Sequence, residues 1–266
     1  MNKDLSIIIP CYNSGNYLTD ATGSIRNSND LANYNYEIIV VNDGSTDTAT
    51  LEILSALEAD DCTVYHQENA GPAAARNHGV KLAKGRYLLF LDSDNRLLPN
   101  FIQQGISLLD STDADIIHGK PTFFGTTTEP RFITGPLIIN KLIVQNYIDI
   151  CCVMRREVLT RINGFDEDRK IIGFEDWELH LNAYCAGCKY HFIDEEVYEY
   201  RVVPDSLSQR HSPDHVRGAY TYIHTKYASL VSQVLYWYWG EYNAYRFDME
   251  RPLRSFFKYY YKKFTR

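Results

Sequence analysis

The chain has 266 residues, of which 45% are hydrophobic and 23% are charged. These values are ordinary for a folded globular protein and argue against extensive disorder, and the length suffices for one domain with an appendage or for two small domains. The net charge of -7 and the pI near 5.6 argue against a nucleic-acid binder that depends on a broad basic face, so no nucleic acid is expected as a partner.

The sequence shows no targeting or membrane-spanning segment. The apolar run from Leu5 to Ile9 is too short for the core of a signal peptide, and no stretch of about 18 uncharged apolar residues follows it. The six cysteines lack the density of a disulfide-stapled secreted domain. Cys185 and Cys188 have CxxC spacing without a second such pair, which favours buried small residues over a zinc or redox site. We therefore expect a cytoplasmic protein.

The first half of the chain alternates short apolar runs with helix-like segments. Runs rich in β-branched and aromatic residues predict strands at 5–9, 36–41, 63–66 and 86–91. Helices are predicted near 16–27, 48–59 and 72–83. This order predicts an α/β fold with a mostly parallel sheet covered by helices on both faces. Ligands bind such sheets beyond the carboxyl ends of the strands, so the polar residues that follow each strand are the site candidates.

Three polar loops follow the predicted strands. They are Pro10-Cys-Tyr-Asn13, Asn42-Asp-Gly-Ser45 and Asp92-Ser-Asp94. Each loop alone is typical of a turn or a helix cap, but three on one edge of a sheet indicate a shared site. Two carboxylates one residue apart repel each other unless a cation or a hydrogen-bond donor compensates. Oxygen ligands of this kind suit Mg²⁺ or Mn²⁺ together with a phosphorylated ligand.

The helix predicted near 72–83 begins with residues that are typical of a helix N-terminus. Gly71 permits a tight turn, Pro72 suits the first helical position, and the alanines that follow propagate the helix. Arg76 would then lie about one turn into the helix. Its side chain would reach the phosphates of a nucleotide or hold Asp92 in place, and a plain surface ion pair is the alternative.

The second half departs from the regular alternation. Residues 119–136, rich in Gly, Thr and Pro, predict a loop or hairpin over the site. Residues 151–166 predict a strand and then a helix that ends at a glycine, and residues 174–185 predict another helix. Glu175 and Asp176 lie in the first turn of that helix, where acidic residues also simply match the helix dipole. A helix N-terminus would keep Asp176 ionised near neutral pH.

Taken together, these motifs resemble the family 2 glycosyltransferases of the GT-A fold. The resemblance runs in the family's order over about residues 4–210 and is carried by Ser6-Ile-Ile-Ile-Pro-Cys-Tyr-Asn13, Val40-Val-Asn-Asp-Gly-Ser45, Asn69-Ala-Gly-Pro-Ala-Ala-Ala-Arg-Asn77, Asp92-Ser-Asp94, Gly164-Phe-Asp166 and Phe174-Glu-Asp-Trp177. It implies a GT-A catalytic domain over 1–211, an α/β/α sandwich with a Rossmann-like nucleotide-sugar half (1–118) and an acceptor half (119–211). Residues 212–266 would form a helical, aromatic and basic extension.

The resemblance implies a metal-dependent, inverting transfer of a sugar from a nucleoside diphosphate, most often UDP, to an acceptor hydroxyl. Asp43 would read the nucleobase, flanked by Pro10, Tyr12 and Asn13. In the third loop Asp92 and Ser93 would meet the ribose and the metal shell, and Asp94 would bind Mn²⁺ or Mg²⁺ directly.

On the acceptor side, the resemblance assigns the general base to Asp176, with Glu175 orienting the acceptor or the base. Trp177 would line the acceptor sugar site, unless its helical spacing places it in the core. The segment 200–211 resembles a loop that closes over the diphosphate. The family often has a His where this chain has Val203, which leaves other side chains for that contact: Arg201, Ser206, Ser208, Arg210 and His211.

The last stretch, residues 251–266, combines six basic and six aromatic residues with no acid. Such a segment would lie on an anionic membrane at its inner face, near a lipid-linked acceptor, or pack its aromatic residues on the domain. From the family we expect a glycan or lipid-linked acceptor in bacterial surface polysaccharide synthesis. A nucleotidyltransferase is disfavoured because the loop after the first strand lacks basic residues. A non-catalytic sugar-nucleotide-binding or assembly subunit is the other alternative.

Overall fold

A computed structural model describes residues 3–60, 62–204, 206 and 210–250 of the chain. The chain divides into two compact units, residues 1–223 and 224–266. The first unit thus extends beyond residue 211, where the sequence predicts the end of the catalytic domain. Residues 213–223, the larger part of the helix α9 (Pro213–Lys226), belong to this first unit.

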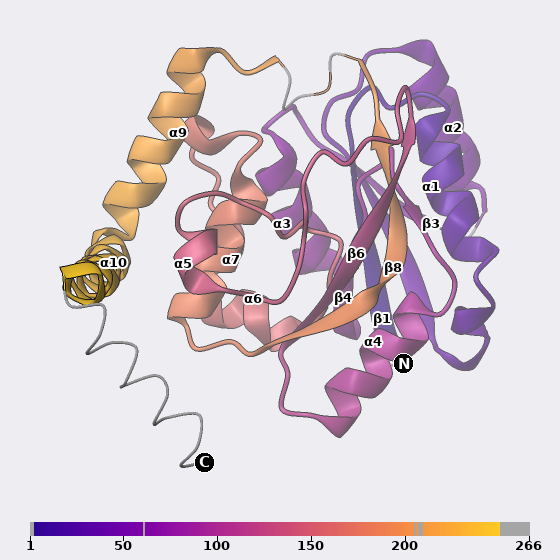
Figure 1. Cartoon of the computed structure of the whole chain (residues 1–266). Coiled ribbons are helices and arrows are strands. Elements are labelled where there is room, and N and C mark those ends of the chain that lie inside the picture. The colour runs from indigo at the N-terminus through magenta and orange to yellow at the C-terminus, as the bar shows by residue number, and fades with distance from the viewer. Residues whose placement is uncertain (1–2, 61, 205, 207–209, 251–266) are drawn as a thin grey trace. The chain divides into compact units, whose positions relative to one another are not determined.

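The first half of unit 1 contains the predicted strands and helices, whose order is shown in Figure 1. In chain order these elements are β1 (Lys3–Cys11), α1 (Tyr17–Arg26), the 3-10 helix η1 (Asn29–Asn33), β2 (Tyr36–Asn42), α2 (Thr48–Glu58), β3 (Cys62–His66), α3 (Pro72–Leu82), β4 (Gly85–Phe90), β5 (Arg96–Leu97) and α4 (Phe101–Ser111). The seven predicted elements are confirmed within two residues at each end, whereas η1, β5 and α4 were not predicted.

The second half adds three strands and several helices. The elements are β6 (Ile116–Gly125), α5 (Ile139–Leu142), β7 (Val153–Arg155), α6 (Arg156–Ile162), the 3-10 helix η2 (Arg169–Ile171), α7 (Glu175–Cys185), β8 (Tyr190–Val202), α9 (Pro213–Lys226) and, in unit 2, α10 (Ala228–Glu250). The predicted strand, helix and glycine stop over 151–166 are confirmed. Asn163 caps α6 in the left-handed conformation, and Gly164 follows with φ +76°.

The described strands form one sheet of order β3-β2-β1-β4-β7-β6-β8-β5. Strands β1 to β4 are parallel to one another, and β7 pairs with β4 and β6 in antiparallel fashion. Strands β6 and β8 are parallel, and the short β5 pairs with β8 in antiparallel fashion at the edge of the sheet. The carboxyl ends of β1, β2 and β4 therefore meet at one edge, as the alternation of elements predicts.

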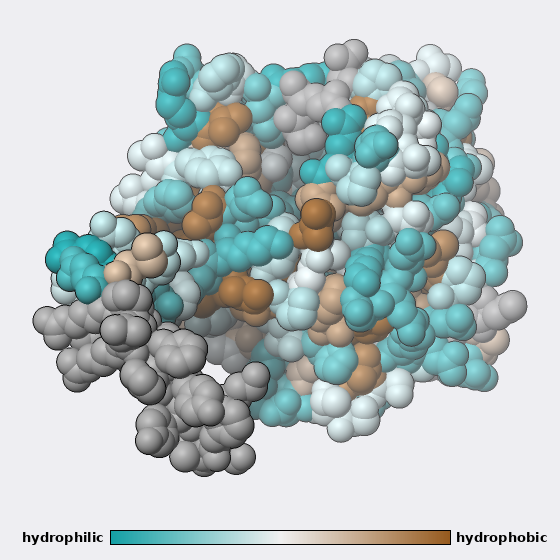
Figure 2. All heavy atoms as spheres, in the orientation of Figure 1, coloured by the Kyte–Doolittle hydropathy of each residue, from teal (hydrophilic) through white to brown (hydrophobic). Residues whose placement is uncertain are grey.

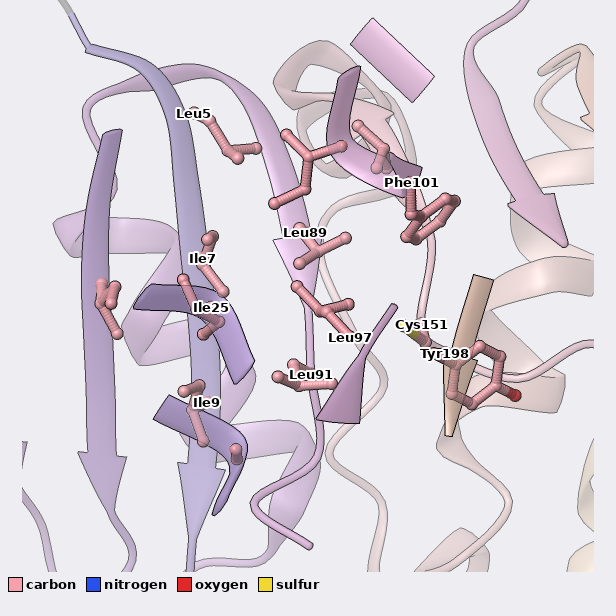
Figure 3. Packing of buried hydrophobic residues seen from close by; sticks show 14 of the residues in the cluster. Leu5, Ile7, Ile9, Ile25, Leu89, Leu91, Leu97, Phe101, Cys151 and Tyr198 are labelled. Atoms are coloured by element: carbon pink, nitrogen blue, oxygen red, sulfur yellow. The ribbon is translucent and has the colours of Figure 1, made fainter. Parts of the chain in front are cut away.

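Helices cover both faces of this sheet. Alternate residues of β1, Leu5, Ile7 and Ile9, lie in a row beside Leu89 and Leu91 (Figure 3) and belong to a buried core to which α1, α2 and α4 contribute. The opposite face of β1 carries α3. A Cβ atom on Gly79 of α3 would come within 2.4 Å of Ile8, so the glycine lets this helix approach the sheet closely. The α/β/α sandwich is confirmed.

The prediction of a loop or hairpin over residues 119–136 is wrong for its first part. Residues 119–125 continue β6 and pair with β8, with register shifts around Lys120 that accommodate Pro121. Phe123 is buried and contacts the ring of Tyr200. Only the residues after Gly125 leave the sheet, before the short helix α5.

Unit 2 is described only by the end of α9 and by α10. The expected helical character after residue 212 is confirmed up to Glu250, and the expected membrane contact through 251–266 lies outside the described residues. None of the described helices combines the length and the hydrophobicity needed to span a membrane. On the face shown in Figure 2, hydrophobic residues form small separate patches among hydrophilic and intermediate ones.

Candidate active site

Asp43 follows β2 and is almost completely buried. Its Oδ1 accepts hydrogen bonds from the Gln67 side chain (2.7 Å) and from the Ala70 backbone N–H (2.8 Å), and its Oδ2 accepts one from the Gly71 N–H (2.9 Å). Gly71 can present its N–H because it adopts φ +96°, which favours glycine. A carboxylate offers about four acceptor positions, so one is left for an N–H donor of a ligand.

Asn13 joins the loops that follow β1 and β2. Its backbone N–H donates to the Ser45 hydroxyl (2.9 Å), and its side-chain oxygen accepts from the Thr46 N–H (2.8 Å). Its left-handed backbone, φ +49°, is one that asparagine tolerates well. Pro10 is buried at the end of β1, whereas the neighbouring Tyr12 is 52% exposed. The turn therefore holds an aromatic ring at the edge where Asp43 lies.

The Asp92-Ser93-Asp94 loop is held from three sides. Arg76 donates from Nη2 to Asp92 Oδ1 (2.7 Å), and the Ser93 hydroxyl lies 2.6 Å from the Ser14 hydroxyl. Arg201 of β8 donates from Nε to the Asp94 carbonyl oxygen (2.8 Å). Of the two roles predicted for Arg76, the structure thus places it against Asp92.

The two carboxylates of this loop fit a divalent cation. Burial, together with the neighbouring Asp92, raises the pKa of Asp94 to about 7, and the positive charge of Arg201 offsets this shift only in part. Among the described residues, no cluster of three or more His, Cys, Asp or Glu side chains forms a complete metal site. Asp92 and Asp94 would therefore hold Mg²⁺ or Mn²⁺ jointly with ligand phosphate oxygens and water. Such an ion would neutralise charge that develops on a departing diphosphate.

Glu175 and Asp176 start α7 and interact electrostatically with Arg76. Glu175 is 5% exposed, and its Oε1 has no hydrogen-bond partner in the structure. Burial raises the pKa of Glu175, while Arg76 opposes the shift. Burial and Glu175 raise the pKa of Asp176 to about 7. Burial and a like charge thus act against the helix dipole, and Asp176 is only partly ionised at neutral pH, less than the helix N-terminus alone predicts.

Arg76 is the cation shared by these acidic groups. It is 6% exposed, and its guanidinium interacts electrostatically with Asp92, Glu175 and Asp176. Burial acts to lower the pKa of Arg76, but these carboxylates outweigh burial and raise it. The guanidinium also lies 5.6 Å from the centre of the Phe165 ring. One buried arginine therefore connects the Asp92 loop to the start of α7.

Two residues of this cluster were missed in the sequence. Asn146 donates from Nδ2 to Asp176 Oδ2 (2.8 Å), and burial, Asp92 and Asp176 raise the pKa of Asp149. Asp149 also accepts from the Cys151 N–H at 2.8 Å. Both residues lie in the irregular segment between α5 and β7, where no periodicity or motif marks a site. The only feature of the sequence that could have indicated a site is that these two residues are polar among apolar neighbours.

The remaining predicted side chains differ in their surroundings. Trp177 is fully buried and donates its indole N–H to the Leu142 carbonyl oxygen (2.6 Å), so its prediction as a residue lining the acceptor site is wrong. Arg201 pairs with Asp20 at 2.6 Å beneath the Asp94 loop. His211 stacks on Phe174, with ring centres 5.3 Å apart. The candidate Ser208 lies outside the described residues.

The fold matches solved structures of TarS from S. aureus. A fragment of residues 1–349 in complex with UDP-GlcNAc aligns with a TM-score of 0.66 and 21% identity over 81% of this chain and 64% of that one. The same fragment in complex with UDP aligns with a TM-score of 0.62 and 23% identity, over 76% of this chain and 61% of that one. These likenesses support the GT-A fold.

Curated relatives of this chain include glycosyltransferases. The glycosyltransferase GlyG of Streptococcus pneumoniae serotype 4 is 29% identical over 76% of this chain and 71% of its own length. The minor teichoic acid biosynthesis protein GgaB of Bacillus subtilis is 32% identical over 78% of this chain, which spans only 24% of GgaB. The family model described as glycosyl transferase family 2 matches residues 6–162, more than half of the sequence. The chain belongs to glycosyl transferase family 2.

Proposed function

We propose that this protein transfers a sugar from a UDP-sugar to a hydroxyl group of a cell-surface glycan or a lipid-linked acceptor, with inversion at the anomeric carbon. TarS complexes hold UDP and UDP-GlcNAc, and GgaB acts in the biosynthesis of minor teichoic acid. The buried Asp43, with one acceptor position left, and the exposed Tyr12 ring suit a nucleobase. Asp92 and Asp94 suit Mn²⁺ or Mg²⁺ and a diphosphate.

The observation that carries the proposal is the position of Asp176. Its carboxylate shares Arg76 with Asp92, yet it lies at the start of α7 and not in the loop that follows β4. A pKa of about 7 suits a general base at neutral pH, because enough of the group is ionised while it still binds a proton strongly. Glu175, whose Oε1 has no hydrogen-bond partner in the structure, would accept a hydrogen bond from the acceptor.

These groups account for the proton, the new bond and the leaving group of the transfer. Asp176 takes the proton from the acceptor hydroxyl, and the oxygen forms a bond to the anomeric carbon from the face opposite the diphosphate. The bond between that carbon and the diphosphate oxygen breaks, and UDP leaves with the electron pair. Asp92 is kept in place for the donor by Arg76. Two neighbouring sites thus serve donor and acceptor, with peripheral membrane contact through 251–266 as a further expectation.

The test is a donor screen with the purified full chain. UDP-, GDP- and dTDP-sugars are each incubated with Mn²⁺, and release of the nucleotide and the anomeric configuration of the product are followed by proton NMR. We expect turnover of a UDP-sugar and a product of opposite anomeric configuration. A retained configuration contradicts the role of Asp176. UDP-sugar binding without turnover in the presence of diverse glycan acceptors would favour the alternative of a non-catalytic binding subunit.

A further inference from the structure

Arg201, near the end of β8, contacts the turn that carries Asp94 at two points. Its backbone N–H donates to the side-chain oxygen of Asn95 (2.9 Å), and its Nε donates to the backbone carbonyl oxygen of Asp94 (2.8 Å). Asn95 is 1% exposed, and its own N–H closes the turn by donating to the Asp92 carbonyl oxygen (3.0 Å). The turn that carries both carboxylates is therefore fastened to a residue 107 positions further along the chain.

The guanidinium of Arg201 is itself held by three elements. Its Nη2 donates to Asp20 Oδ2 of α1 at 2.6 Å. It lies over two aromatic rings, 4.5 Å from the centre of Tyr17 in α1 and 4.3 Å from the centre of Phe124 in β6. The side chain is only 10% exposed. A planar guanidinium can stack on rings and donate in its own plane at the same time, so these contacts fix its orientation.

These contacts favour a different role for Arg201 from the diphosphate contact that the resemblance suggests. The charge of Arg201 is already paired with Asp20, and the largely buried guanidinium offers little surface to a ligand. Its hydrogen bond to Asp94 goes to the backbone oxygen and leaves the carboxylate for other partners. Groups that hold a metal-binding residue from behind orient it and tune its affinity for the ion.

We propose that Arg201 is a positioning residue for the divalent cation, because it fixes the turn from which Asp92 and Asp94 would bind that ion. This role rests on the proposed function, since it requires a cation and a diphosphate at the turn. Ligands that are held in their binding arrangement lose less freedom when the ion binds, which increases affinity. Arg201 also belongs to the segment 200–211, which resembles a loop that closes over the diphosphate, so it links that segment to the turn.

Arg96 provides a matched control in the same cluster. It also donates to Asp20 Oδ2 at 2.6 Å, and its guanidinium lies 4.6 Å from the centre of the Phe124 ring. Within the described part of the chain, the Arg96 side chain makes no hydrogen bond to the Asp94 turn. Arg201→Lys and Arg96→Lys both keep the charge and lose the planar group. Only the first change removes a contact with the turn.

Hydrogen–deuterium exchange of the free full chain tests whether Arg201 fixes the turn. Exchange is read by mass spectrometry over peptides that cover residues 92–95. Arg201→Lys should speed exchange there roughly fivefold or more, because the turn loses a hydrogen bond to a charged group. Arg96→Lys should leave exchange unchanged. This measurement requires neither metal nor nucleotide.

Calorimetry of UDP binding at a series of Mn²⁺ concentrations tests the role toward the cation. Arg201→Lys should raise the Mn²⁺ concentration at half-maximal UDP binding roughly tenfold, and Arg96→Lys should not. At saturating Mn²⁺ the UDP affinity of both variants should approach that of the unchanged chain. A direct contact with the diphosphate predicts the opposite pattern, in which UDP affinity stays low at saturating Mn²⁺ and the Mn²⁺ requirement is unchanged.

A second variant covers the case in which Arg201→Lys does not fold. Tyr17→Leu keeps the hydrogen bonds of Arg201 and removes one ring under its guanidinium. It should change the exchange and the Mn²⁺ requirement in the same direction as Arg201→Lys, but less. Tyr184→Leu is its control, because that ring is 37% exposed against 39% for Tyr17 and lies at the other end of α7 from the acidic pair.

Two results would overturn the positioning role of Arg201. One is equal exchange over residues 92–95 in Arg201→Lys and Arg96→Lys. The other is the calorimetric pattern of a direct diphosphate contact. Absence of UDP binding to the unchanged chain with Mn²⁺ would instead overturn the proposed function, and with it the role toward the cation. The exchange comparison would then still show whether Arg201 fixes the turn.

Discussion

Asn146 donates a 2.8 Å hydrogen bond from Nδ2 to Oδ2 of Asp176, thirty residues further along the chain. The other oxygen, Oδ1, accepts from the backbone N–H of Trp177. Both oxygens of the proposed base are therefore oriented, one by its own helix and one by the irregular segment before β7. A hydrogen bond to the charged form of a carboxylate favours that form.

Asn146→Ala should raise the pKa of Asp176 above its value of about 7, because the ionised carboxylate loses a donor. At neutral pH kcat should fall roughly tenfold, and much of the loss should be recovered at higher pH, where Asp176 ionises again. The measurement is the pH profile of kcat. Asn182→Ala is the matched control, because Asn182 bonds to the Ile162 carbonyl oxygen from the same helix as Asp176. A uniform loss at every pH would make Asn146 a structural residue only.

Asp176→Asn should lower kcat by roughly 10²–10⁴-fold with little change in UDP affinity, because a general base acts on the acceptor and not on the nucleotide. In the unchanged chain, activity should rise with pH through about 7 as the carboxylate loses its proton. Glu175, Arg76, Asp92 and Asp149 all contribute to the field at this group. Glu157→Gln, an exposed acid in the first turn of α6, should leave kcat and its pH dependence unchanged. Retention of turnover in Asp176→Asn would assign the base elsewhere.

Arg76→Gln should destabilise the fold, because it leaves Asp92, Glu175 and Asp176 without their shared cation. Breaking a buried ion pair costs about 3 kcal/mol, and Asp92, 31% exposed, places this case at the lower end of the range. Urea unfolding measures the change in the free energy of unfolding. Arg86→Gln, which removes an exposed pair with Asp110, should cost only about 0–1 kcal/mol. Equal effects of the two changes would refute the central position of Arg76.

Gly173→Ala should destabilise unit 1 and lower kcat, because Gly173 lies just before the acidic start of α7. Its φ is +83°, and a Cβ atom would come within 2.2 Å of the His211 ring. Gly187→Ala provides the control, since φ is +76° there and no atom lies within 4 Å of the added Cβ. Thermal unfolding of both variants separates backbone strain, common to both, from the clash. Adding His211→Ala to Gly173→Ala should restore part of the loss, and failure to do so would exclude the contact.

The parallel half of the fold was predictable because each of its elements carries its own signal. Asp47 caps α2 by accepting from the Thr50 N–H, and Pro72 starts α3 after a glycine in a positive-φ conformation. Strand β6 was missed because Pro121 and the nearby Gly and Thr residues are typical of loops. Its pairing with β8 depends on tertiary contacts that no local pattern encodes.

The candidate site was predictable where a residue sits at the end of a strand or the start of a helix. Asp43, Asp92, Asp94, Glu175 and Asp176 all do so, and topology alone brings the first three to one edge. Burial shifted one expectation and, for Trp177, decided between the two alternatives. It raises the pKa of Asp176 to about 7, and it places the whole Trp177 side chain in the core. The pKa of a side chain depends on how deeply the fold buries it and on the charges that the fold places nearby. Sequence spacing gives neither of these directly.

In the proposed donor site Asp94 acts together with a divalent cation, and isothermal titration of UDP measures whether binding needs both. UDP is titrated with and without Mn²⁺ into the unchanged chain, into Asp94→Asn, and into Asp113→Asn, whose carboxylate is 80% exposed on the surface. We predict tight binding only when Mn²⁺ and Asp94 are both present, with at least a roughly tenfold loss, about 1.4 kcal/mol, when either is missing. Asp113→Asn should bind like the unchanged chain. UDP affinity that responds neither to Mn²⁺ nor to Asp94→Asn, or no UDP binding at all, would exclude this donor site.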